Sequence, residues 1–207
     1  GRKLLIPPKE QMSEGRNQGA IDASIWPEPV PAVSPDMWLD GIHHISAITN
    51  DLDQAGAFYE EALGLSLVKK TYNQDDGKIK HYFWAAYDGQ TVGPHSSMTL
   101  FDWQRSTALA RPGAGQSHHI AFRAESAEQQ FAWRDHLLAL GIQVSEVMDR
   151  SYFESIYFRA PDGLIVEIAT DGPGFAADEP VESLGCALKL PASLEPHRPQ
   201  IEDSLIP

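Results

Sequence analysis

Two pairs of adjacent histidines are the residues of this sequence best suited to bind a metal. His43 and His44 lie in the stretch GIHHISAITN, and His118 and His119 lie in SHHIAFR. Each pair opens a short run of apolar and β-branched residues, which favours a strand. Imidazole is a common ligand of transition metals, and a strand holds it rigidly. We interpret the two pairs as two halves of one metal site.

A carboxylate later in the chain could complete such a site. Glu167 lies in LIVEIAT, where its neighbours on both sides are apolar. Burying an ionised carboxylate is costly unless it is paired or bound to a metal. Two histidines and one carboxylate on one face are typical of a non-haem Fe(II) site with open positions for substrate and O2. The alternative is an edge strand on which Glu167 faces water.

Strand geometry limits how many of these histidines can be ligands. Adjacent side chains point to opposite faces, so only one histidine of each pair can face inward without a bulge. A lone histidine is more often packed in a core, but the repetition of the pair favours a site. In the first copy the position that matches Glu167 is Thr99, which is a poor ligand. The predicted ligand set is therefore two histidines and one glutamate.

The elements that must position these residues form an internal repeat, in which each copy is a strand, a helix and three further strands. Asp51 and Gly64 suit the start and end of the first helix, and Ser126 and Gln129 form a capping box for the second. This pattern predicts an α+β fold, with two βαβββ modules forming a curved mixed sheet around a metal site. The expected strands span residues 42–49, 65–72, 81–87, 96–103, 118–123, 143–148, 155–160 and 163–169.

A predicted hairpin brings a tyrosine to the carboxylate. The stretch RAPDGLI is typical of a three-residue loop that ends in a left-handed glycine. With Ala160 opposite Leu164, Tyr157 falls opposite Glu167 in the paired strand. A hydroxyl at that place is useful as a proton donor. The alternative is a core or interface tyrosine, because a one-residue slip would send Tyr157 to the other face.

Long stretches of the chain resemble a known family. They are GIHHISAITND, FYEEALGLSLVKKTYNQDD, SHHIAF, RSYFESIYFRAPDGLIVEIATDGPGF and DEPVESLGCALKLP. Two such modules with these histidine motifs resemble the vicinal oxygen chelate superfamily, which includes glyoxalases, bleomycin resistance proteins and extradiol dioxygenases. Within it, the chain is similar to the ring-cleaving dioxygenases that open hydroquinones, over about residues 41–203.

The resemblance implies a metal and a set of residues around it. It implies Fe(II) held by His44, His119 and Glu167, although Mn(II) suits the same ligands. It also implies supporting catalytic roles for a second group of residues: His43, His118, Arg150, Tyr157 and Ser46. Strand alternation independently places Ser46 on the same face as His44. The alternative for Arg150 is a surface ion pair with Asp149 or Glu146.

The chain also departs from the family pattern. The usual member is about half as long again and has four modules, with its site in the first and last, whereas this chain shows two. Ser46 stands where the family commonly has Thr, and Gln74 stands where it commonly has Phe. These two changes leave the pocket walls, and so the substrate, open. The missing middle modules would leave apolar surface exposed, so we expect a homodimer.

The resemblance implies ring opening of a hydroquinone-type aromatic diol with O2, as part of aromatic compound catabolism. The nearest alternative is a catechol extradiol dioxygenase, which uses the same ligands. A glyoxalase-like isomerase or lyase normally needs a fourth protein ligand, and Thr99 does not provide one. A module that only binds aromatic compounds commonly lacks the three ligands.

The net charge, the lengths of the apolar runs and the single cysteine indicate which partners and which compartment to expect. The net charge of −13 disfavours nucleic acid and anionic membrane surfaces as partners. No apolar run approaches the ~18–20 residues of a membrane span, and no secretion signal is expected. A lone cysteine, Cys186, fits a reducing compartment, so we expect a cytoplasmic protein.

The sequence divides into three predicted segments. Residues 1–38 are a Pro-rich N-terminal arm, residues 39–172 are the paired-module domain, and residues 173–207 are a C-terminal tail with a short helix near 181–188.

Overall fold

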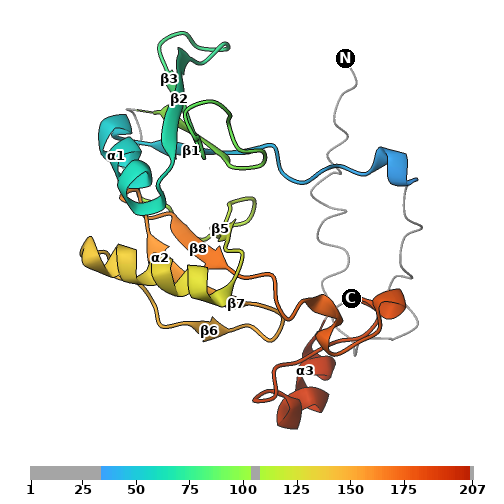
Figure 1. The fold of residues 1–207 in the computed structure, drawn as a ribbon. Coiled ribbons are helices and arrows are strands. Elements are labelled where there is room, and N and C mark those ends of the chain that lie inside the picture. Colours follow the sequence, from blue (N-terminus) through green and yellow to red (C-terminus); the bar gives the residue numbers. More distant parts are fainter. Residues whose placement is uncertain (1–33, 104–107, 206–207) are drawn as a thin grey trace. The chain divides into compact units, whose positions relative to one another are not determined.

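The computed structural model describes residues 34–103 and 108–205 (Figure 1). Most of the predicted Pro-rich arm, residues 1–33, lies outside the described residues. The chain divides into two units, one of which is Leu39–Gly174. The described part of the other unit contains only short helices: η2 (Pro35–Met37), η3 (Phe175–Ala177), η4 (Val181–Ser183), η5 (Glu195–His197) and α3 (Arg198–Ser204). The helix expected near 181–188 is thus one turn long, and α3 was not predicted.

The first half of the unit Leu39–Gly174 is a βαβββ module. Its sheet has the order β1-β4-β3-β2, with β1 parallel to β4 and the other neighbours antiparallel. This arrangement leaves β1, the strand that carries His44, at one edge. The elements are β1 (His44–Thr49), α1 (Leu52–Leu63), β2 (Ser66–Tyr72), β3 (Lys80–Ala85) and β4 (Ser97–Asp102).

The second half repeats this topology with the strand order β5-β8-β7-β6. It confirms the α+β prediction of two βαβββ modules. The elements are β5 (His119–Arg123), α2 (Ala127–Ala139), β6 (Met148–Asp149), β7 (Glu154–Arg159) and β8 (Ile165–Ala169). The strand expected at 143–148 is mostly irregular, and only Met148 of this range joins the sheet, in β6. Val144 and Val147 still pack against the core.

The two modules form two separate four-stranded sheets, where one continuous curved sheet was expected. Side-chain packing joins them instead of strand pairing, and buried residues of both halves share one core. On the helical side, Phe58 contacts Phe158 with ring centroids 6.2 Å apart, and His136 Nε2 lies 2.7 Å from the Glu61 carbonyl oxygen. Figure 1 shows α1 beside the first sheet and α2 beside the second.

The helix ends follow the predicted capping chemistry. Asp51 Oδ1 accepts hydrogen bonds from the backbone N–H groups of Asp53 and Gln54, at 3.1 and 2.9 Å. The helix ends at Gly64, whose φ of 63° is the left-handed conformation that suits glycine. Ser126 Oγ accepts from the Gln129 N–H at 3.2 Å. Within the described ranges, no helix is long and apolar enough to cross a membrane.

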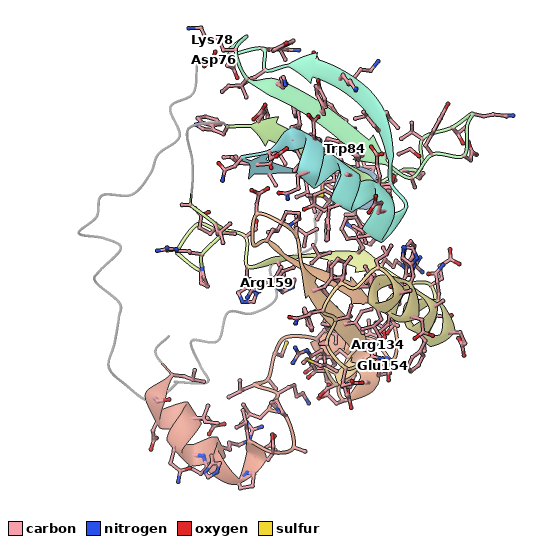
Figure 2. All side chains as sticks on the ribbon, turned by 90° about the vertical axis from the view of Figure 1, so that its left-hand side faces the viewer. Asp76, Lys78, Trp84, Arg134, Glu154 and Arg159 are labelled. Carbon is pink, nitrogen blue, oxygen red and sulfur yellow. The ribbon has the colours of Figure 1, made fainter. Side chains whose placement is uncertain are left out.

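Each sheet has a helix-covered face and an opposite face that carries polar residues. In the first module, Trp84 is 2% exposed and lies beside α1 (Figure 2), where its Nε1 donates to Glu60 Oε1 at 2.9 Å. Because side chains alternate along a strand, His81 and Phe83 of β3 point away from α1. In the second module, Gln130 of α2 donates from Nε2 to the carbonyl oxygens of Glu154 and Ile168, both at 2.8 Å.

The close approach of α1 to its sheet makes one glycine sensitive to substitution. A Cβ built on Gly56 would lie 2.6 Å from Cζ2 of Trp84, a ring already fixed by its bond to Glu60. We expect Gly56→Ala to lower the free energy of unfolding by about 1–3 kcal/mol, because overpacking outweighs the gain in helix propensity. Urea unfolding followed by circular dichroism would measure the change.

The matched control is Gly77→Ala, because a Cβ at Gly77 would meet no atom within 4 Å. Its effect should stay within about 0.5 kcal/mol, as for most surface changes. Equal stability of the two variants would contradict the close packing of α1 on Trp84.

Candidate functional site

The buried carboxylate of Glu167 is the centre of the polar face of the second module. Glu167 is 2% exposed and lies on β8, between β5 and β7, so it is not on an edge strand facing water. Its Oε1 accepts hydrogen bonds from Tyr157 Oη at 2.9 Å and from Ser155 Oγ. Its Oε2 lies 2.9 Å from Nε2 of His119. Two hydroxyl donors therefore hold one oxygen and leave the other beside the histidine.

The predicted hairpin produces this arrangement. Ala160 N–H donates to the Leu164 carbonyl oxygen at 2.9 Å, and the loop closes through Gly163, whose φ is 85°. Tyr157 is paired directly with Glu167 in the β7–β8 ladder, as the loop length predicted. A slip by one residue would have placed the tyrosine on the other face.

Arg150 lies against the same tyrosine. Its Nε donates to Tyr157 Oη at 3.2 Å, and its guanidinium carbon lies 5.0 Å from the centre of the ring. The alternative partner Glu146 is bound to Arg134 instead, at 2.8 Å. The tyrosine hydroxyl thus accepts from Arg150 and donates to Glu167, so a cation and a carboxylate are linked through one phenol.

The two histidine pairs have the same geometry in both modules. Nδ1 of His118 lies 2.9 Å from Nδ1 of His119, and Nδ1 of His43 lies 2.8 Å from Nδ1 of His44. The rings of each pair meet edge to face, at interplanar angles of 88° and 84°. One histidine of a pair can therefore fix the tautomer of the other through Nδ1 and leave its Nε2 free for a metal.

The first module has hydroxyl groups where the second has its carboxylate. Thr99, fully buried on β4, donates from Oγ1 to Ser46 Oγ at 2.9 Å. His81 Nε2 lies 2.9 Å from the same Thr99 oxygen. Burial lowers the pKa of His81 below its usual value, and nearby His44 lowers it further. The imidazole of His81 thus stays neutral at pH values where an exposed histidine becomes protonated.

The structure brings together two of the three predicted metal ligands. His119 and Glu167 are in direct contact, whereas His44 lies with Ser46 and His81 on the first sheet. Among residues 34–103 and 108–205, no three His, Cys, Asp or Glu side chains form a group that could hold a metal ion. The separation of His44 from the pair accompanies the division into two sheets that do not share a ladder.

A cavity of about 780 Å³ opens beside the assembled pair. Its lining includes His118, His119, Arg150 and Tyr157 together with apolar side chains such as Met148 and Ile165. This volume lies in the range of sites for small organic ligands, which are mostly apolar with a few convergent polar groups. An aromatic ring could therefore enter next to the histidine and the tyrosine.

Comparison with known proteins shows to which superfamily this fold belongs. The sequence profile of the Glyoxalase/Bleomycin resistance protein/Dioxygenase superfamily matches residues 41–168, which contain both modules. The chain belongs to this superfamily. A superfamily structure from Frankia sp. EAN1pec has a TM-score of 0.55 at 19% identity, covering 66% of this chain and 96% of that one. At this identity the likeness shows the fold.

Curated relatives within the superfamily carry dioxygenase names. A Bacillus subtilis protein named as a ring-cleaving dioxygenase, MhqO, is 36% identical over 84% of this chain and 52% of its own length. Chlorohydroquinone/hydroquinone 1,2-dioxygenase of Sphingobium indicum is 30% identical over 84% of this chain and 51% of its own. The chain thus spans about half the length of these relatives. Their names support a dioxygenase activity in this branch of the superfamily.

The residues of the second module fit a divalent metal in their chemistry. An imidazole and a carboxylate are ligands that Fe(II) and Mn(II) share. The carboxylate is buried, and hydroxyl donors occupy only one of its two oxygens. Such outer hydrogen bonds are the usual means by which proteins orient a metal ligand.

Ser155 is a part of this site that the sequence analysis did not identify. It is fully buried and donates from Oγ to Glu167 Oε1. The signal for it was present, because Ser155 lies two residues before Tyr157 and so shares its face of β7. A small serine in a predicted strand has many ordinary explanations, and only the contact itself reveals its partner.

We expect Ser155→Ala to weaken metal binding. Without its hydroxyl, Glu167 loses one of the two donors that orient it, and supporting hydrogen bonds of this kind contribute about tenfold or more to metal affinity. Calorimetric titration of the metal-free protein with Mn(II) would measure the affinity. The control is Ser204→Ala, an exposed serine of α3. Unchanged Mn(II) affinity in the Ser155 variant, with the fold intact, would refute the orienting role.

Proposed function

We propose that this protein is an Fe(II)-dependent dioxygenase that opens the ring of hydroquinone-type aromatic diols, and that Mn(II) can occupy the same site. The observation that carries this proposal is the buried Glu167, held by two hydroxyls on one oxygen and facing His119 with the other. A carboxylate and a histidine presented together beside a cavity supply two of the three ligands that non-haem Fe(II) oxygenases use.

The metal would be held by His119 and Glu167, with His44 as the third predicted ligand. When bound, it would supply open coordination positions at which an aromatic diol and O2 can meet. His118 contacts only the Nδ1 side of His119, so it supports that ligand without blocking Nε2. The apolar part of the cavity lining would exclude water from the ring.

Arg150 and Tyr157 would act on the oxygen of the substrate. The hydroxyl of Tyr157 carries a proton next to the carboxylate, and Arg150 donates to the same oxygen. Because the Arg150 guanidinium keeps its protons, the phenol of Tyr157 can exchange a proton only with the carboxylate or with an oxygen of the substrate. The guanidinium would stabilise negative charge that develops on substrate oxygen.

The overall reaction is balanced without an external reductant. One ring bond beside a hydroxyl breaks, and both atoms of O2 enter the product. The Sphingobium indicum relative is named as a hydroquinone dioxygenase, which supports the choice of a para-diol over a catechol. A glyoxalase-like isomerase is less well supported, because Thr99 stands at the place of a fourth protein ligand.

The direct test is oxygen uptake by protein loaded with Fe(II) under anaerobic conditions. Hydroquinone, methylhydroquinone and catechol would be supplied in parallel. We expect uptake with the two hydroquinones, because the proposal assigns the site to para-diols. Glu167→Gln should abolish it, since a neutral amide replaces the charged ligand. The control Glu125→Gln changes an exposed residue outside the site and should retain wild-type uptake.

The outcomes separate the candidate reactions. Faster uptake with catechol than with either hydroquinone would assign the protein to catechol cleavage. No uptake with any of the three, from protein that holds one iron per chain, would overturn the dioxygenase proposal.

A further inference from the structure

The cavity beside the second histidine pair contains two arginines that are bound to no carboxylate of the described residues. Its described lining includes Arg150 and Arg159 but no aspartate or glutamate. Arg150 donates to the Tyr157 hydroxyl and to the Met148 sulfur, and Arg159 donates from Nη1 to the Gly163 carbonyl oxygen at 2.9 Å. Both guanidinium groups thus keep their positive charge without an acidic partner.

This state contrasts with that of other arginines in the described chain, which are bound to carboxylates. They are Arg123 with Asp171, Arg134 with Glu146, and Arg198 with Glu195 and Glu202. The chain as a whole has a net charge of −13, which repels small anions. A cavity that holds two cations free of acidic partners therefore attracts an anion against this background.

Strand register places Arg159 in line with His119. Arg159, the last residue of β7 (Figure 2), is paired with Ile165 on β8, and His119 on β5 is paired with the same isoleucine. Paired residues point to the same face, so these three side chains form one row. Two strand spacings of about 4.8 Å put the Cα atoms of the histidine and the arginine roughly 10 Å apart. Ile165 lines the cavity between them and offers apolar surface.

The guanidinium of Arg159 presents an unused edge. Its Nη1 is tied to the carbonyl oxygen of Gly163, and no described residue accepts a hydrogen bond from its Nε or Nη2. These two nitrogens form one side of the planar guanidinium, and their parallel N–H groups match the two oxygens of a carboxylate. The exposed side chain of Arg159 is therefore already oriented for a bidentate contact.

We propose that Arg159 binds a carboxylate of the substrate, so that the substrate class is a hydroquinone that carries a carboxylate on its ring. A hydroxyl of this diol would face His119 and the metal, its ring would lie over Ile165, and its carboxylate would pair with Arg159. Unsubstituted hydroquinone would keep the first two contacts and bind more weakly. This inference rests on the proposed function and narrows its substrate class.

The test is calorimetric binding to the Mn(II)-loaded full chain under argon, where no turnover occurs. The ligands are 2,5-dihydroxybenzoate, the corresponding neutral amide, and hydroquinone. The acid and the amide have nearly the same shape and differ in charge. We expect the acid to bind about tenfold or more tightly than either neutral ligand, the contribution of one charge-assisted pair.

Arg159→Gln should abolish this preference by weakening only the binding of the acid. Arg159→Lys keeps the positive charge but lacks the paired N–H groups, so it should restore part of the preference. Because both variants lose the Nη1 contact with Gly163, their Mn(II) affinity reports whether the hairpin still holds Glu167 in place. The control is Arg111→Gln, which removes the same charge from an exposed residue outside this cavity and should bind all three ligands as wild type.

The outcomes distinguish this inference from the function on which it rests. Equal binding of the acid and the amide by a wild-type protein that consumes hydroquinone would overturn the anion subsite and leave the dioxygenase standing. Equal weakening of all three ligands in both Arg159 variants would assign the arginine to the hairpin and overturn its contact with substrate. Binding of the acid through Arg159, without oxygen uptake from any diol, would overturn the dioxygenase and keep the anion site. A wild-type protein that binds none of the three would overturn both.

Discussion

The buried charge of Glu167 is the constraint that organises the second module. A carboxylate that is 2% exposed needs donors close at hand, since burial without partners is costly. Two hydroxyl donors come from β7, Ser155 and Tyr157, and Nε2 of His119 on β5 lies 2.9 Å from the other carboxylate oxygen. The strands must keep their register for all three to arrive. The hairpin turn before β8 therefore has a chemical consequence as well as a structural one.

The helical side of the sheet supports the same register. Gln130 of α2 is fully buried and bonds to the carbonyl oxygens of Glu154 and Ile168, which belong to β7 and β8. These carbonyls are the immediate neighbours of Ser155 and Glu167 in the chain. The helix thus holds from behind the two strands whose front face carries the site. A buried polar contact of this kind favours one alignment of the strands over its alternatives.

The internal duplication presents different polar side chains on one repeated scaffold. In both modules the two adjacent histidines contact each other through Nδ1. Both modules also have a side-chain hydrogen bond between residues at diagonal positions on neighbouring strands. That bond joins Ser155 to Glu167 in one module and His81 to Thr99 in the other. A buried hydroxyl, Thr99, thus stands in one module at the position that a buried carboxylate, Glu167, holds in the other. Duplication followed by divergence at few positions can produce such an asymmetric site.

The sequence by itself determined the local features of this protein: the capped helices, the repeated module, and the pairing of Tyr157 with Glu167. These follow from short-range rules, because alternation and loop length act over a few residues. Tertiary structure decided the features that depend on contacts between distant segments. It placed Ser155 on the carboxylate, brought His81 to 2.9 Å from Thr99, and divided the expected single sheet into two, with His44 and His119 on different sheets. No local pattern specifies these contacts, because they arise from the packing of strands and helices that are far apart in the chain.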